Sequence, residues 1–495
     1  MKPRSQSHLQ PLSLFNGFNI RFLLFYVFIL LVSLEVIKSG FVVKKLPGWL
    51  GDLPFTLETG YVGVGESNDV QLFYYFIESE GNPENDPLIL WLTGGPGCSA
   101  LSSILYEIGP FTFNYANSTL KKPVFEIKPH SWTKVANIIF LDQPAGTGFS
   151  YAKSRDAYIT NDTLSSMHGY DFLRKWLVDH PKFLNNPFYL GGESYMGIVG
   201  PMIIQEIYKG NEVGEGPKIN IKGYMLGNPL TDTNSDYNSR IPFVHRVGLL
   251  SDEIYKSTKK NCHGEYFNIV DLDNSRCIND LQVVDKCIGR INKPQILEPA
   301  CDTSNTLKYD LFGRKLRSLD KASMDMWSLT QVQIQGCRDD HYLFSYVWAN
   351  RRDVREALHI DEEFDKIEWV RCNETLFFYI DKEPISYTHN VLNTVAYHRY
   401  LANKNCRALV YSGDHDMVHP YLGTMKWIES LNFLVVNDWR PWFVDKQVAG
   451  YTMKYSHHEY NLTFATLKGG GHTAPEYKPK ECFNMVKMWL ANDAL

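Results

Sequence analysis

Residues 187–197 read PFYLGGESYMG, an apolar run that leads into a glycine-rich turn with a serine at position 194. The run is typical of the end of a buried strand, and the turn after it predicts a sharp change of chain direction. Gly192 suits such a turn, because a residue without a side chain lets the backbone double back on itself. Met196 departs from the small residue of the common Gly-x-Ser-x-Gly form. Ser194 is a candidate nucleophile, although a serine after a strand is more often only part of a turn.

Two later segments supply the partners that a catalytic serine needs. Residues 408–420 read ALVYSGDHDMVHP, an apolar strand that ends in a Gly-Asp turn, and residues 464–472 read FATLKGGGH, a strand followed by glycines and a histidine. Together they place Ser, Asp and His in the chain order of α/β-hydrolases, each just past the carboxyl end of a strand. His472 would take the proton from Ser194, and a buried carboxylate would fix the tautomer of the imidazole and stabilise the imidazolium.

Two carboxylates compete for the third position of this triad. Asp414 directly follows a glycine and suits a side chain that caps the turn, whereas Asp416 lies further round the loop and can point back at His472. We therefore favour Asp416 and keep Asp414 as the alternative. His415 and His419 lie four residues apart, but no helix or third ligand accompanies them in the sequence, so we expect neither a metal nor a cofactor.

A second glycine-rich loop is expected to stabilise the charge that develops on a substrate carbonyl. Residues 87–92 read PLILWL, a short apolar strand, and residues 93–99 read TGGPGCS, the loop after it. Glycines leave backbone N–H groups accessible, and such groups stabilise a developing oxyanion. The N–H groups of Gly95 and Tyr195, the residue after the serine, are the predicted donors.

Five segments, in order along the chain, resemble the signature blocks of the serine carboxypeptidase family. They read WLTGGPGCS at 91–99, DQPAGTGFSY at 142–151, GESY at 192–195, SGDHD at 412–416 and GGH at 470–472. The resemblance implies an α/β-hydrolase fold, with a mostly parallel central sheet covered by helices on both faces and a helical, disulfide-bearing lid insertion. It also implies a catalytic triad of Ser194, Asp416 and His472.

The same resemblance implies four residues that contact the substrate. The family's peptidases hold a substrate carboxylate with an asparagine, the glycine after it and two glutamates, and here Gly94, Glu107 and Glu193 match three of these positions. Thr93 stands at the asparagine position, and its hydroxyl offers one donor hydrogen where a carboxamide offers two. The two carboxyls would share a proton, because neighbouring carboxylates cannot both ionise cheaply. The threonine weakens the expectation of exopeptidase action.

The chain also resembles one branch of the family, the plant serine carboxypeptidase-like acyltransferases. The segments that carry this resemblance read TGGPG at 93–97, SGDHDM at 412–417, NDWRPW at 437–442, QVAGY at 447–451 and KGGGHTAPEYKP at 468–479. The resemblance implies transfer of a hydroxycinnamoyl or benzoyl group from a 1-O-glucose ester to an alcohol or amine, through an acyl-enzyme on Ser194. Release of C-terminal amino acids by a serine carboxypeptidase is the alternative, and a non-catalytic binding protein is a third hypothesis.

The pattern of apolar residues predicts one large core with an insertion. Strand-like runs at 71–77, 88–92, 137–141, 188–190, 223–226, 408–411 and 463–467 alternate with helical patterns such as those at 166–179 and 483–490. We expect the first part of the core over 40–234 and the second over 351–495. The cysteine-rich, less strand-like segment over 235–350 is the expected lid.

The amino terminus and the charge balance predict the compartment and the class of partner. Basic residues precede an apolar stretch at 22–34, which is shorter than the about 20 residues of a membrane span, so we expect a signal peptide over 1–39 and no stable membrane anchor. The destination would be the vacuole or the cell exterior. A net charge of −5 argues against nucleic acid. The resemblance to the acyltransferase branch implies small-molecule partners, the acyl glucose donor and the alcohol or amine acceptor.

Nine cysteines fit an oxidising compartment. The family resemblance implies two disulfides, and a third is expected beside them, in the pairs Cys98–Cys337, Cys262–Cys277 and Cys287–Cys301. The remaining candidates for a free thiol are Cys372, Cys406 and Cys482. Four N-glycosylation sequons fit the same compartment, and they begin at Asn117, Asn161, Asn373 and Asn461.

Overall fold

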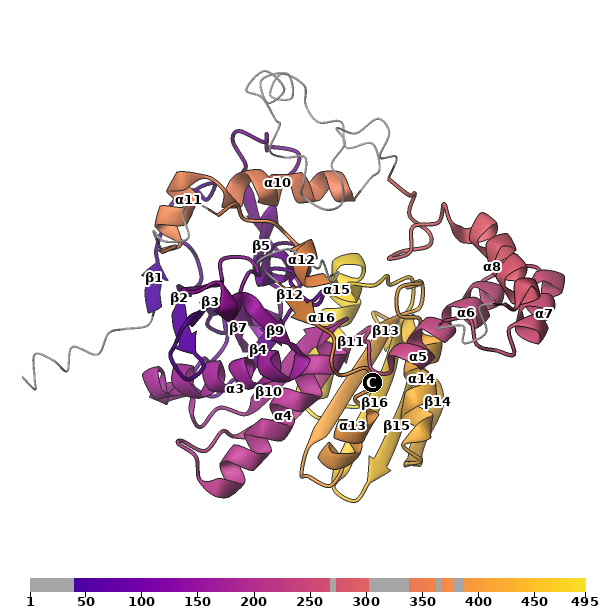
Figure 1. The fold of residues 1–495 in the computed structure, drawn as a ribbon. Coiled ribbons are helices and arrows are strands. Elements are labelled where there is room, and N and C mark those ends of the chain that lie inside the picture. Colours follow the sequence, from indigo (N-terminus) through magenta and orange to yellow (C-terminus); the bar gives the residue numbers. More distant parts are fainter. Residues whose placement is uncertain (1–39, 268–272, 302–337, 362–366, 378–385) are drawn as a thin grey trace, which may run out of the picture. The chain divides into compact units, whose positions relative to one another are not determined.

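A large sheet runs through the part of the chain that the computed structural model describes, and helices cover both of its faces (Figure 1). The described residues are 40–267, 273–301, 338–361, 367–377 and 386–495. The predicted signal peptide falls on residues 1–39 and lies outside them. Within the described ranges, no helix has the length and apolar character needed to span a bilayer.

Six parallel strands form the centre of the sheet. They lie in the order β7 (Asn137–Leu141), β4 (Leu88–Leu92), β10 (Phe188–Glu193), β11 (Ile221–Gly227), β13 (Arg407–Gly413) and β16 (Tyr460–Leu467). All six had been expected as strands from their apolar runs. These runs show no polar alternation, because both faces of a parallel sheet are buried under helices. The fold is that of an α/β-hydrolase, as expected.

Antiparallel strands extend the sheet at both ends. At one end β3 (Val70–Ile77) pairs with β7 and continues to β2 (Leu57–Val64) and β1 (Gly40–Val43). At the other end β15 (Gln447–His457) pairs with β16, and β14 (Leu434–Val444) forms the edge. Smaller pairings join β8 (Tyr151–Ala152) to β3, β5 (Phe111–Phe113) to β6 (Phe125–Ile127), and β9 (Ile159–Asn161) to β12 (Ser386–Thr388).

Side chains on the two faces of the sheet enter two separate hydrophobic clusters. On β3, Leu72 and Tyr74 join one cluster, whereas Phe73 and Tyr75 join the other, as the period of two along a strand requires. The first cluster contains buried side chains of α3 (Asp162–Asp179), α4 (Met196–Val213), α13 (Val395–Leu401) and α14 (Tyr421–Ser430). The second contains those of α10 (Asp339–Ala349), α11 (Arg352–Ala357) and α16 (Pro479–Leu490). The helices expected at 166–179 and 483–490 are α3 and α16.

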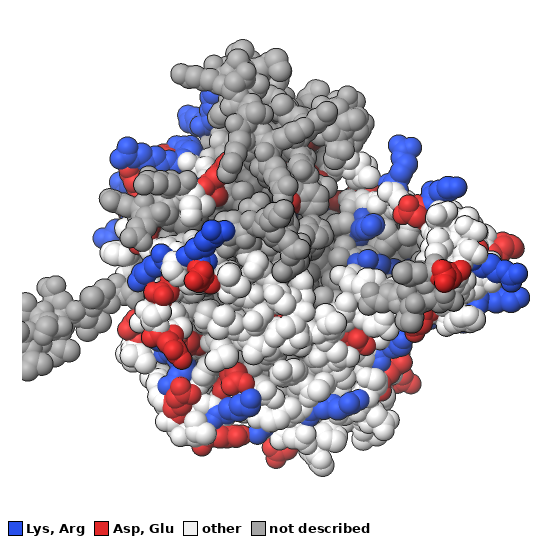
Figure 2. All heavy atoms as spheres, in the orientation of Figure 1, with Lys and Arg blue, Asp and Glu red and all other residues white. Residues whose placement is uncertain are grey.

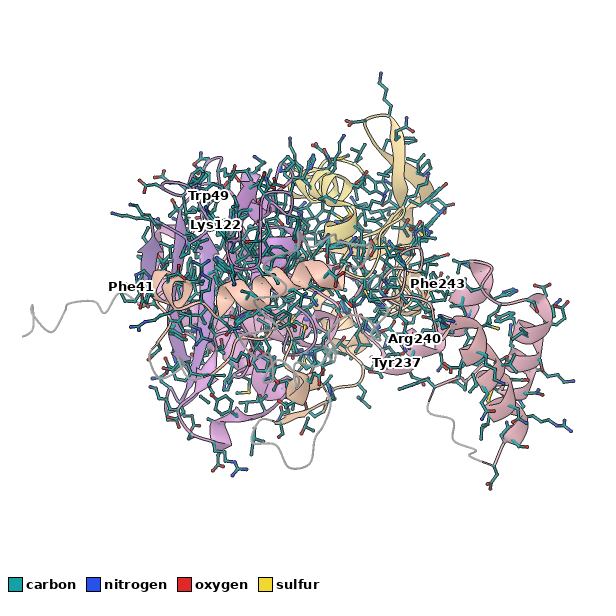
Figure 3. All side chains as sticks on the ribbon, turned by 90° about the horizontal axis from the view of Figure 1, so that it is seen from above. Phe41, Trp49, Lys122, Tyr237, Arg240 and Phe243 are labelled. Carbon is teal, nitrogen blue, oxygen red and sulfur yellow. A yellow bond between two sulfur atoms is a disulfide. The ribbon has the colours of Figure 1, made fainter. Side chains whose placement is uncertain are left out.

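Between β11 and β13 the chain leaves the sheet. Its first helices there are α5 (Thr233–Asn238), α6 (Arg240–Arg246), α7 (Asp252–Asn261) and α8 (Ser275–Ile288). Seen from above, α7 and α8 lie beside each other, and Tyr237, Arg240 and Phe243 lie on the segment that joins them to the core (Figure 3). A cluster around Phe243, Val244 and Met417 packs this segment against the loop after β13. The lid role of the segment remains a prediction.

The disulfide of Cys98 corrects one sequence prediction. Cys98 bonds to Cys372, not to Cys337, which lies outside the described residues. The two cysteines face each other across an antiparallel bridge, in which the Ser99 N–H donates to the Arg371 carbonyl at 2.8 Å. The partners are 274 positions apart, and spacing along the sequence carries no sign of such a contact.

The other cysteines give one agreement and one further correction. Cys262 bonds to Cys277, as the family resemblance implied, and the bridge joins the ends of α7 and α8. Cys287 is an exposed free thiol, whereas Cys301 is disulfide-bonded, so the predicted Cys287–Cys301 pair is wrong. The buried free thiols in the described residues are Cys406 and Cys482.

Candidate active site

Ser194 occupies the turn between β10 and α4. Its φ is 56°, in the left-handed region that residues with side chains rarely adopt, as a sharp strand-to-helix turn requires. A Cβ at Gly192 would lie 2.7 Å from the Leu92 carbonyl oxygen and 2.8 Å from Met196 Cβ, so this position needs glycine. Met196 is buried in the first turn of α4, which explains how a longer side chain fits where the common motif has a small one.

The structure brings Ser194, His472 and Asp416 into one hydrogen-bonded chain. His472 Nε2 lies 2.9 Å from Ser194 Oγ, and His472 Nδ1 lies 2.8 Å from Asp416 Oδ2. The three side chains follow β10, β13 and β16, so the carboxyl ends of parallel strands converge on them. Asp414 instead accepts a hydrogen bond from the Gly469 N–H at 2.6 Å and closes the turn. This geometry suits a nucleophile, a general base and a group that orients the base.

Asp416 is fully buried and held from three sides. The Val418 N–H donates to its Oδ1 at 2.7 Å, and Asn228 Nδ2 donates to its Oδ2 at 2.9 Å. Burial alone would raise the pKa of Asp416, but the charge and hydrogen bond of His472 and the Val418 N–H hold that pKa below its ordinary value. The sequence analysis missed Asn228, and its only signal was a Gly-Asn-Pro turn directly after an apolar run.

The loop between β4 and α2 (Ala100–Ser102) packs directly on the nucleophile. A Cβ at Gly94 would lie 2.6 Å from Ser194 Cβ, and Gly95 has a φ of 116°. In the described part of the chain, the N–H groups of Gly95 and Tyr195 donate to no other protein group. Asp142 holds the far end of the loop, accepting from Ser99 Oγ at 2.8 Å and from the Ala100 N–H at 2.7 Å. Both predicted oxyanion donors are therefore available to a ligand.

Glu107 and Glu193 form a buried carboxyl pair beside this loop. Glu107 ends the π-helical turn η1 (Ser103–Glu107) and Glu193 ends β10. The Oε2 atom of each is buried without a hydrogen-bond partner among the described residues. Burial, followed by the negative charge of Glu107, raises the pKa of Glu193 well above its ordinary value. These effects favour the protonated form of one carboxyl of the pair.

Thr93 lies at the same place but its hydroxyl is already engaged. Thr93 Oγ1 and Ser103 Oγ are 2.9 Å apart, and Ser103 also accepts from the Trp91 indole N–H at 3.0 Å. The threonine is buried, and Ser103 is the hydrogen-bond partner that its hydroxyl has in the described structure. No amide group extends from this position toward the carboxyl pair.

Arg371 is a second residue that the sequence analysis missed. Its guanidinium lies over the Tyr342 ring, 3.9 Å from the centroid, and Nε is buried without a hydrogen-bond partner in the described residues. The positive charge of Arg371 opposes the rise in pKa of Glu107 and Glu193, so the guanidinium lies close enough to act on both carboxyls electrostatically. Its only signal was its place next to Cys372, which had been left as a candidate free thiol.

The parallel sheet and the Ser-His-Asp arrangement define an α/β-hydrolase with the chain order and strand positions of that class. A family model described as serine carboxypeptidase matches residues 47–492. The chain therefore belongs to the serine carboxypeptidase family.

Relatives from plants match nearly the whole chain. Serine carboxypeptidase-like 19 of Arabidopsis thaliana is 45% identical over 479 residues, which is 96% of this chain and 100% of that relative. Serine carboxypeptidase-like 17 of the same plant is 44% identical over 467 residues, 94% of this chain and 97% of the relative. The crystal structure of KEX1(DELTA)P, a prohormone-processing carboxypeptidase from Saccharomyces cerevisiae, has a TM-score of 0.70 at 21% identity and covers 92% of this chain and 96% of its own. That likeness supports the fold alone.

Proposed function

We propose that this protein is a serine-dependent acyltransferase, which moves a hydroxycinnamoyl or benzoyl group from a 1-O-glucose ester to an alcohol or amine. The observation that carries the proposal is at Thr93, whose hydroxyl lies 2.9 Å from Ser103 Oγ. The family's peptidases place an amide at this position to hold a substrate carboxylate. Here the position offers no such amide, and the sequence segments around it resemble the acyltransferase branch.

In the first half-reaction Ser194 Oγ attacks the ester carbonyl of the donor. Its proton passes to His472 Nε2, and the buried charge of Asp416 stabilises the imidazolium. The N–H groups of Gly95 and Tyr195 would receive the oxyanion. Collapse of the tetrahedral intermediate breaks the bond to the glucose oxygen, which takes the proton from His472 and leaves. The acyl group is then an ester on Ser194.

In the second half-reaction an acceptor must outcompete water. Water is present at roughly 55 M, whereas a well-aligned bound acceptor can reach an effective molarity of about 10⁵ M or more. Groups that can align it are the proton on the Glu107–Glu193 pair and the Arg371 guanidinium. His472 Nε2 takes the acceptor proton while the acceptor oxygen or nitrogen bonds to the acyl carbonyl carbon. Collapse of the tetrahedral intermediate breaks the bond to Ser194 Oγ, which takes the proton back from His472, and the new ester or amide leaves.

Binding energy for a small substrate would come from this site and not from the charge of the whole surface. Figure 2 shows acidic and basic side chains interspersed over the described residues of the visible face. Mixed signs give no strong field to steer a highly charged ligand. A neutral sugar ester fits such a surface.

Carboxypeptidase action is the second candidate function, and the carboxyl pair favours it. Glu107 and Glu193 each keep a buried oxygen with no hydrogen-bond partner among the described residues, and a peptide carboxylate could contact this pair through its proton. A peptidase would release an amino acid from the same acyl-enzyme chemistry, with water as the acceptor.

A product assay on purified, glycosylated protein at mildly acidic pH separates the candidates. Hydroxycinnamoyl and benzoyl glucose esters are offered with mixed alcohols and amines, and a blocked dipeptide is offered in parallel. We expect a new ester or amide that Ser194→Ala does not form. Amino-acid release without transfer would replace the proposal with the peptidase. Thr93→Asn is the informative variant, because it restores the amide and should increase any dipeptide cleavage.

Serine labelling tests the third hypothesis, a non-catalytic binding protein. A fluorophosphonate reacts with a serine only when the triad activates it. We expect labelling that is lost in Ser194→Ala. Failure of the folded wild type to react would favour the binding protein.

A further inference from the structure

One short segment of the insertion lies against the two loops that carry Asp416 and His472. We call residues 293–296 the strap. The Lys293 carbonyl accepts from the Met417 N–H at 2.9 Å, and the Ile296 N–H donates to the His415 carbonyl at 3.2 Å. These two contacts are with the residues on either side of Asp416. The strap therefore holds the backbone of the aspartate loop before and after the carboxylate.

The strap also holds the histidine. The Pro294 carbonyl accepts from the backbone N–H of His472 at 2.7 Å. A Cβ at Gly471 would lie 2.5 Å from the same carbonyl oxygen, so the glycine lets the two segments touch. Three backbone hydrogen bonds, from Lys293, Pro294 and Ile296, thus join the strap to the aspartate loop and to the histidine itself.

Gln295 adds a side-chain contact between the strap and the histidine loop. It is only 4% exposed, and its Nε2 donates to the Gly469 carbonyl at 3.1 Å. Its Oε1 accepts from the Leu297 N–H at 3.3 Å, which fixes the orientation of the amide. Residues 469–471 are all glycine and have more backbone freedom than any other tripeptide. The amide restrains this run just before His472.

A second anchor lies at the other end of the described insertion. Arg338 forms ion pairs with Glu298, close after the strap, and with Glu476, four residues after His472. Its guanidinium also lies 4.2 Å from the centroid of the Tyr477 ring. Glu476 and Tyr477 belong to α15 (Ala474–Tyr477), so Arg338 contacts the segment that follows His472 in the sequence.

We propose that the strap aligns the triad and that Gln295 is a positioning residue for His472. The loop after β13 and the loop after β16 come from different strands, and the strap contacts both. A displacement of about 1 Å at a catalytic group can cost about 100-fold in rate. Without the hydrogen bond from Gln295, residues 469–471 could adopt several backbone conformations, and only some of these would place His472 within reach of Ser194 Oγ. The inference rests on the serine chemistry proposed above but on no choice of acyl group or acceptor.

The test compares Gln295→Met with the wild-type full-length protein by the kinetics of fluorophosphonate labelling. Methionine keeps the approximate length and packing of the side chain but removes both the Nε2 donor to Gly469 and the Oε1 acceptor from Leu297. We expect the maximal rate of labelling to fall about tenfold or more. The concentration of reagent at half-maximal rate should stay within about twofold, because the Gln295 side chain contacts Gly469 and Leu297 and none of the groups proposed to bind the ligand. Leu297→Ala is the matched control, since Leu297 lies on the same segment and is 70% exposed.

Thermal unfolding of each variant separates positioning from folding. A labelling loss that appears without a matching loss of folded protein supports the positioning role. If Gln295→Met does not fold, Gln295→Asn keeps the donor on a shorter side chain and should show the same loss in milder form. Labelling of either folded variant at the wild-type rate overturns the inference and leaves the proposed function intact. A wild type that does not label overturns both, because no active triad would then exist to be aligned.

Discussion

The carboxylate of Asp416 shows how much of the proposed chemistry depends on one buried charge. It accepts hydrogen bonds from His472, Asn228 and Val418 and has no exposed surface. Each of these donors favours the ionised form. The histidine can therefore keep one tautomer and one orientation throughout the reaction.

Asp416→Asn should lower kcat by a factor on the order of 10⁴, because a carboxamide can hold the wrong imidazole tautomer. Asp414→Asn is the control, since Asp414 lies in the same loop but accepts from the Gly469 N–H. Its kcat should change by less than about tenfold. Steady-state kinetics of both variants decide between the two aspartates, and equal losses would argue against the assignment.

Glu193→Gln should remove a pH dependence of substrate binding. Because the pKa of Glu193 is raised, the neutral form persists at mildly acidic pH and is lost as the pH rises through that pKa. In the wild type KM should then rise, approaching tenfold per pH unit above the pKa. Glutamine is neutral at every pH, so the variant should show a flatter KM profile. Glu206→Gln, on the outside of α4, is the control.

The same group makes a prediction for stability. Folded Glu193 holds its proton more tightly than the unfolded chain does, so its contribution to stability is present at low pH and falls as the pH rises above its ordinary pKa. The free energy of unfolding of the wild type should decrease over this range more than that of Glu193→Gln. Denaturant unfolding at several pH values measures both slopes, and equal slopes would contradict the assignment of the raised pKa.

At the level of single elements, the Cys98–Cys372 disulfide ties the loop that carries Gly94 and Gly95 to the segment that carries Arg371. Two groups proposed to contact the substrate thus share one covalent link. The bridge also closes a loop of 274 positions, so it restricts the unfolded chain strongly.

Replacement of Cys98 and Cys372 by serine should lower the free energy of unfolding by about 2 to 5 kcal/mol. It should also slow fluorophosphonate labelling, because the loop against Ser194 would lose its anchor. The matched control replaces Cys262 and Cys277 by serine, because their disulfide joins α7 to α8 away from the triad. That pair should affect unfolding but leave the labelling rate of folded protein unchanged. Non-reducing peptide mapping checks the pairing itself.

The elements that could be predicted from sequence share one property, burial on both faces. Runs such as LILWL at β4 are apolar throughout because helices cover them on both sides. β14 is exposed along most of its length and bears no such pattern, so its strand was not predicted. β1, β2 and β15 were missed as well.

The residues of the site likewise divide into those that the sequence predicted and those that it did not. Ser194, Asp416 and His472 follow predictable strands and stand in motifs, so the sequence was sufficient to nominate them. Asn228 and Arg371 are isolated polar residues that belong to no recognisable motif in the sequence. Their importance comes from contacts with residues far away in the chain, which only the folded structure displays.

For the whole molecule, the expected secretory route can be tested through its sequons, which the structure does not treat alike. Asn117 is exposed, whereas the Nδ2 of Asn373 donates to the Gly146 carbonyl at 2.8 Å. Glycosylation at Asn373 would remove this contact beside the Cys98 loop. We expect a glycan on Asn117 and none on Asn373. Glycopeptide mass spectrometry measures both, and Asn117→Gln should shift the protein on a gel where Asn373→Gln does not.

The distance in sequence between the serine and its base has a consequence for biosynthesis. Ser194 and His472 are 278 positions apart, and the histidine follows β16, which must add to the sheet after β13. At about 5 to 20 residues per second, roughly 15 to 60 seconds of translation separate the two residues. A ribosome-bound chain therefore carries an inert serine. Until β16 has been synthesised, Ser194 cannot react with an acyl ester, because His472 is missing. The serine becomes reactive only when β16 has joined the sheet.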